Sequence, residues 1–91
     1  MAGKTFAEVK AELGKKLIGH GAIVTQVAGE QTVEDTFEYL DELRESGQTN
    51  MFGAAPFVAQ ELGFGNSYDE KKLAREILSG WMETFGERSA R

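Results

Sequence analysis

Five carboxylates on one predicted helix are the side chains of this sequence best suited to do chemistry. They recur at three- and four-residue spacing and are Glu34, Glu38, Asp41, Glu42 and Glu45. Carboxylates at this spacing share a helix face, where they could bind a divalent cation or exchange protons. No histidine accompanies them, and the Asp-rich loop pattern of calcium sites does not occur. We therefore predict no metal site here, but a solvated acidic face that could contact a basic surface of another protein.

Other catalytic groups are scarce. Cysteine is absent, His20 is the only histidine, and no serine has a base that the sequence identifies as its partner. The glycine-containing residues 63–66 lack the lysine of a phosphate-binding loop. We predict a protein that is not an enzyme, with no catalytic residue and no cofactor.

The length and charge of the chain limit which classes of protein remain possible. A chain of 91 residues with 41% apolar side chains and a net charge of −5 predicts one small domain over residues 1–91. Nucleic-acid binding is disfavoured by this charge, because affinity for phosphates comes mainly from cations. No apolar run approaches the ~20 residues that span a bilayer, and the N-terminus lacks a signal-peptide core. We expect a cytoplasmic protein with no membrane partner.

Three helix starts are marked by local side-chain chemistry. In each, a hydroxyl residue is followed three positions later by an acid, as in a capping box. The pairs are Thr5 and Glu8, Thr32 and Asp35, and Ser67 and Glu70.

The first half of the chain predicts two helices and a connector. Apolar side chains after Thr5 recur with helical spacing up to about Gly19. Residues 22–28 are rich in β-branched side chains and predict a short strand or an extended connector, which could pair with a second copy in a homodimer. The helix from Thr32 should end at Gly47, which suits a helix C-cap.

The second half predicts two more helices. Pro56 fits a helix that begins at Ala54 or Ala55, and Gly63 fits its end. The last helix has a broad apolar face, on which Gly80 predicts a close approach of another backbone. The predicted fold is mainly α: an N-terminal helix and connector (1–31), a trihelical, helix-turn-helix-like unit (32–86) and a tail (87–91).

The segment FVAQELGF offers an alternative function. Ala59 followed by Gly63 matches the first helix and turn of a helix-turn-helix unit. Lys71, Lys72 and Arg75 would then stand on the first turns of the second helix, where phosphates and bases are contacted. A helix-turn-helix DNA-binding regulator is therefore the competing hypothesis.

The turn SGQTNMFGAAPF carries large apolar side chains. We assign Phe57 to the short helix and the core, which leaves Met51 and Phe52. Apolar side chains in loops pack into the core more often than they remain exposed, so we expect these two to pack inward. If they are exposed, they mark a protein-binding site.

Residues 38–86 resemble a known group of sequences. The segments EYLDELRESGQTNMFGAAPFVAQELGF and AREILSGWMETF are similar to those of small phage and prophage proteins of largely unassigned function. The most specific pieces are residues 49–54 and Trp81-Met82, whereas the first 30 residues and GNSYDEKK lie outside the resemblance. The resemblance implies a role in regulation, virion assembly or interference with a host machine, and it supplies no catalytic residues.

These observations together predict a non-enzymatic, phage-type accessory protein. It would bind a host or phage protein in the cytoplasm of an infected or lysogenic bacterium, using the acidic helix and the turn at Met51 and Phe52. Inhibition of a host or defence machine is one form of this function. A structural subunit of a phage particle is a further alternative.

Overall fold

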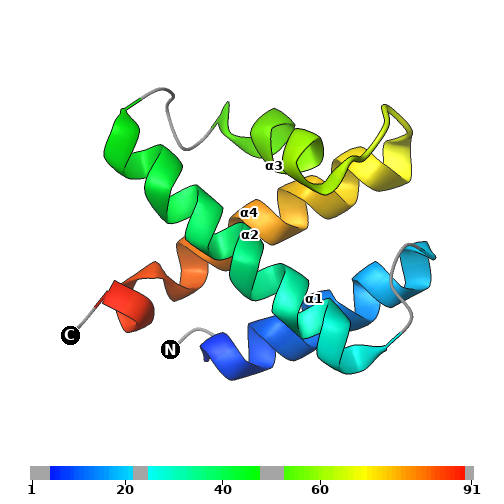
Figure 1. The fold of residues 1–91 in the computed structure, drawn as a ribbon, viewed down its shortest axis with the longest axis horizontal. Coiled ribbons are helices and arrows are strands. Elements are labelled where there is room, and N and C mark those ends of the chain that lie inside the picture. The colour runs from blue at the N-terminus through cyan, green and yellow to red at the C-terminus, as the bar shows by residue number, and fades with distance from the viewer. Residues whose placement is uncertain (1–4, 22–24, 48–52, 90–91) are drawn as a thin grey trace.

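Four α-helices form the part of the chain that the computed structural model describes, which is residues 5–21, 25–47 and 53–89. They are α1 (Phe6–His20), α2 (Gln26–Ser46), α3 (Ala55–Leu62) and α4 (Tyr68–Ser89). The long helices α2 and α4 cross near the centre, with α1 and α3 on opposite sides of the crossing (Figure 1). The mainly α fold predicted from the sequence is confirmed, and the described residues contain no strand.

Two of the predicted helix starts are confirmed by their capping contacts. The Glu8 N–H donates to Thr5 Oγ1 at 3.2 Å, and the Thr5 N–H donates to Glu8 Oε1 at 3.0 Å. At the start of α4, the Glu70 N–H donates to Ser67 Oγ at 3.2 Å. Each hydroxyl therefore satisfies an amide that has no partner within its helix.

The predicted start of α2 at Thr32 is wrong. The helix begins at Gln26, with the Thr25 hydroxyl accepting from the Ala28 N–H at 3.1 Å, and Thr32 lies inside it, where its hydroxyl donates to the Ala28 carbonyl. The extended backbone predicted for residues 22–28 is therefore wrong from Gln26 onward, and residues 22–24 lie outside the described residues. Packing against α1 outweighs the β-branched composition of this segment.

That packing brings two helix backbones into contact at a pair of glycines. A Cβ added at Gly29 of α2 would lie 2.7 Å from the carbonyl oxygen of Gly14 in α1. A Cβ added at Gly14 would lie 3.1 Å from the Glu30 nitrogen. Both glycines are buried, so α1 and α2 cross at a separation that no larger residue allows.

Gly80 of α4 also lies at a close contact, but of a different kind. A Cβ there would lie 2.8 Å from Val9 Cγ1 and 3.1 Å from Leu13 Cδ1. The expected approach of another backbone is thus wrong, because side chains of α1 fill the space. The backbone contact is the one between Gly14 and Gly29.

The core is formed by apolar residues from all four helices. The partly buried Phe57 packs against it, as expected. The buried apolar residues are Val9, Leu13, Leu17, Val33, Phe37, Leu40, Leu43, Ala54, Val58, Leu73, Ala74, Ile77, Leu78 and Trp81.

The glycine contact can be tested with Gly29→Ala. We expect this change to lower the free energy of unfolding by up to about 2 kcal/mol, because overpacking costs ~1–3 kcal/mol and the gain in helix propensity offsets ~1 kcal/mol. Urea unfolding followed by circular dichroism measures the difference. The matched control is Gly19→Ala in α1, where an added methyl meets nothing within 4 Å and should stabilise the helix. Equal stability of the two variants would contradict the contact.

Candidate functional site

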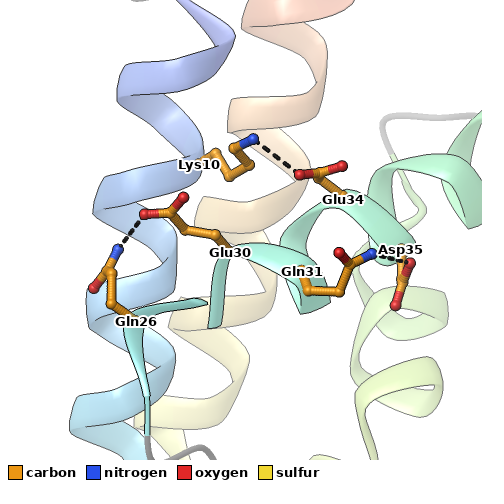
Figure 2. Close-up of polar contacts among 6 residues, drawn as sticks. All are labelled: Lys10, Gln26, Glu30, Gln31, Glu34 and Asp35. Carbon is orange, nitrogen blue, oxygen red and sulfur yellow. Dashed lines mark hydrogen bonds and ion pairs between the residues drawn. The ribbon is translucent and has the colours of Figure 1, made fainter. Parts of the chain in front are cut away.

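The predicted acidic face of α2 is divided between internal and exposed groups. Lys10 Nζ of α1 donates to Glu34 Oε2 at 2.9 Å, and Figure 2 shows Glu34 turned toward this lysine. The indole N–H of the buried Trp81 donates to Asp41 Oδ1 at 2.8 Å, which ties α4 to α2. Glu34 and Asp41 therefore belong to the helix packing.

The other three predicted carboxylates remain on the surface. Glu38, Glu42 and Glu45 are exposed, and none has an ion pair or hydrogen bond within the described ranges. Their spacing of four and three residues aligns them along one side of α2. We call these three residues the acidic strip. Met51 and Phe52, the other predicted contact residues, lie outside the described residues.

The three cations predicted to read DNA are exposed on the first half of α4. Lys71, Lys72 and Arg75 have no ion pair in the described part of the chain. They do not share one surface, however. Lys72 lines a hollow between α1 and α4 together with Lys16 and His20, whereas Lys71 and Arg75 line a groove between α3 and α4.

The α3–α4 groove is a feature that the sequence reasoning missed. Its volume is ≈ 490 Å³, and its lining residues are Ala55, Pro56, Ala59, Gln60, Phe64, Gly65, Asn66, Lys71, Ala74 and Arg75. The sequence feature that indicates this groove is the pair of small side chains Ala55 and Ala59, which are one turn apart on α3. Small residues at a helix contact leave space where larger ones would fill it.

The turn after α3 positions one end of this groove. Gly63 has a φ of 72°, which a residue with a side chain rarely adopts, and it ends α3. The Phe64 N–H then donates to the Ala59 carbonyl at 2.8 Å. The Phe64 ring packs against His20 of α1, with 5.0 Å between ring centroids. Through this contact, α1 supports a residue that lines the groove between α3 and α4.

Glu70 holds the same turn from the start of α4. Backbone N–H groups of Gly65 and Ser67 and the Ser67 hydroxyl lower the pKa of Glu70 below its ordinary value of 4.5, with the Gly65 contact the largest cause. His20 Nε2 lies 3.4 Å from Glu70 Oε2 and lowers the pKa in the same direction when protonated. The charged form of Glu70 is thus the one that fits the turn.

This lowered pKa has a consequence for stability. A carboxylate with a folded-state pKa below its unfolded value stabilises the fold above pH ~4.5, and the effect is lost as pH falls through the folded-state pKa. We expect Glu70→Gln to lower the melting temperature at pH 7 and to leave it nearly unchanged at an acidic pH below the folded-state pKa of Glu70. Thermal unfolding at both values measures this. The control is Glu61→Gln on the exposed face of α3, which should change neither value; an equal loss for Glu70→Gln at both pH values would contradict the role of its charge.

The described residues contain no group of three His, Asp or Glu side chains arranged to hold a metal ion. None of the helices in residues 5–21, 25–47 and 53–89 is both long and apolar enough to cross a membrane. What the described surface does offer is the acidic strip, the cations of α4 and the α3–α4 groove.

Comparison with known proteins gives no further assignment. No family model, curated protein or solved structure matches the chain. The resemblance of residues 38–86 to phage proteins stays a prediction.

Proposed function

We propose that this chain is a non-enzymatic accessory protein of phage type that acts by binding a host or phage protein in the bacterial cytoplasm. The observation that carries the proposal is the acidic strip: three carboxylates aligned on α2 that have no hydrogen bond or ion pair among the residues that the structure describes. Inhibition of a host or defence machine is one form that such binding takes. The phage origin is supported by the resemblance of residues 38–86 alone.

The partner surface should be basic. Aligned charges of one sign speed association with a surface of opposite sign and fix the orientation of the complex. Glu34 and Asp41 are less available, because each already accepts a hydrogen bond within the fold. The strip formed by Glu38, Glu42 and Glu45 is therefore the part of the predicted acidic face that engages the partner.

The experiment compares single charge reversals. Partners are captured from a bacterial lysate with the unmodified protein, identified, and purified for calorimetry. We expect Glu38→Lys, Glu42→Lys and Glu45→Lys each to weaken binding by about three- to tenfold, since charge pairs across an interface are worth ~1 kcal/mol or more. Glu61→Lys, an exposed reversal on α3, is the control. Equal affinity of all four variants would refute the assignment to the strip.

A DNA-binding regulator remains the second candidate. It is favoured by Lys71, Lys72 and Arg75 on the first turns of α4, which are exposed and have no ion pair among the described residues, and by the short α3 before them. The test is binding to mixed-sequence duplex DNA at low and rising salt. We expect no binding at low salt. A steeply salt-dependent affinity that disappears in Lys71→Glu would instead establish the regulator.

A further inference from the structure

The α3–α4 groove combines an apolar wall with a cationic rim. Ala55, Pro56 and Ala59 of α3, Ala74 of α4 and Phe64 of the turn between them line the groove. Its volume of ≈ 490 Å³ lies within the range of about 300–1,000 Å³ found for ligand pockets. Such a groove can accept apolar side chains from another molecule.

The charges on the rim have no counterpart within the described fold. Lys71 and Arg75 are four residues apart, so they lie on the same side of α4. The acids next to them in sequence are engaged elsewhere: Glu70 binds the turn at Gly65 and Ser67, and Glu76 pairs with Lys16 of α1. Lys71 and Arg75 are therefore available to an external carboxylate.

We propose that this groove binds an amphipathic peptide segment of a partner protein, with apolar side chains between α3 and α4 and a carboxylate against Lys71 and Arg75. Helices with apolar residues one turn apart commonly dock into grooves of this kind. The guanidinium of Arg75 can hold a carboxylate through two parallel hydrogen bonds, which adds specificity. This site is separate from the acidic strip and selects the opposite charge.

Two other occupants fit the groove less well. A DNA backbone carries phosphates for the cations, but no apolar group to fill the space between the alanines. A second copy of this chain could offer its acidic strip, yet the large exposed apolar side chains of the described residues are Val27 and Tyr68, and neither belongs to the strip. A peptide that joins apolar and acidic side chains satisfies both parts of the groove.

The test is selection from a displayed library of random helical peptides, with the full chain as target. We expect the enriched peptides to combine apolar residues one turn apart with Asp or Glu. For the best peptide, Arg75→Glu and Lys71→Glu should each reduce affinity by about tenfold or more, as should replacement of its acid by the amide. Lys15→Glu, an exposed reversal on α1, should change affinity less than twofold. Amide chemical shifts on peptide binding should change at the groove residues.

Several results would overturn the proposal. They are the absence of any enriched peptide, enrichment without the apolar and acidic pattern, or equal affinity of Arg75→Glu and Lys15→Glu. Displacement of the peptide by duplex DNA that itself binds through Arg75 would assign the groove to nucleic acid. A dimer in sedimentation that Arg75→Glu dissociates would assign it to self-association. Because the acidic strip is not involved, Glu42→Lys should leave peptide affinity unchanged, which separates this test from that of the proposed function.

Discussion

The contact between Gly14 and Gly29 is the constraint on which the arrangement of the helices depends. It lets α1 and α2 approach until backbone meets backbone, and two side-chain contacts then span the same interface. Gln26 Nε2 donates to the Ala11 carbonyl at 3.1 Å, and Lys10 pairs with Glu34. On the same helix α1, the side chains of Val9 and Leu13 lie against Gly80 of α4. Glycines thus allow the close approach of α1 to both α2 and α4.

The packing of the helices also determines which charged side chains are available to bind a partner. Three of the contacts between helices use an acid: Glu34 between α1 and α2, Asp41 between α2 and α4, and Glu76 between α1 and α4. Glu70 is used in the turn that precedes α4. These contacts leave the net charge of −5 unchanged, but they reduce the number of carboxylates that are available to a partner.

Structural features that depend on residues close in the sequence were predicted correctly, whereas features that depend on contacts between distant residues were not. Capping pairs such as Ser67 and Glu70, and the helix ends at Gly47 and Gly63, follow from local backbone chemistry and are confirmed. The start of α2 was wrong because Gly29 pairs with Gly14, fifteen residues earlier and on another helix. The role of Asp41 and the α3–α4 groove were missed for the same reason. Asp41 meets Trp81, and Ala74 meets the residues of α3, only in the folded chain.

The two candidate surfaces lie on different helices and share no residue. The second half of α2, which carries the acidic strip, and the first half of α4, which carries the cations, diverge from the point where the two helices cross (Figure 1). Electrostatic interactions between exposed charges are screened over about 8–10 Å at physiological salt. Charges of the strip that lie farther than this from Lys71 and Arg75 therefore do not neutralise them. If both proposals hold, a partner with a basic surface and a partner with an acidic, amphipathic segment bind different residues of the same chain, so that one small protein connects the two.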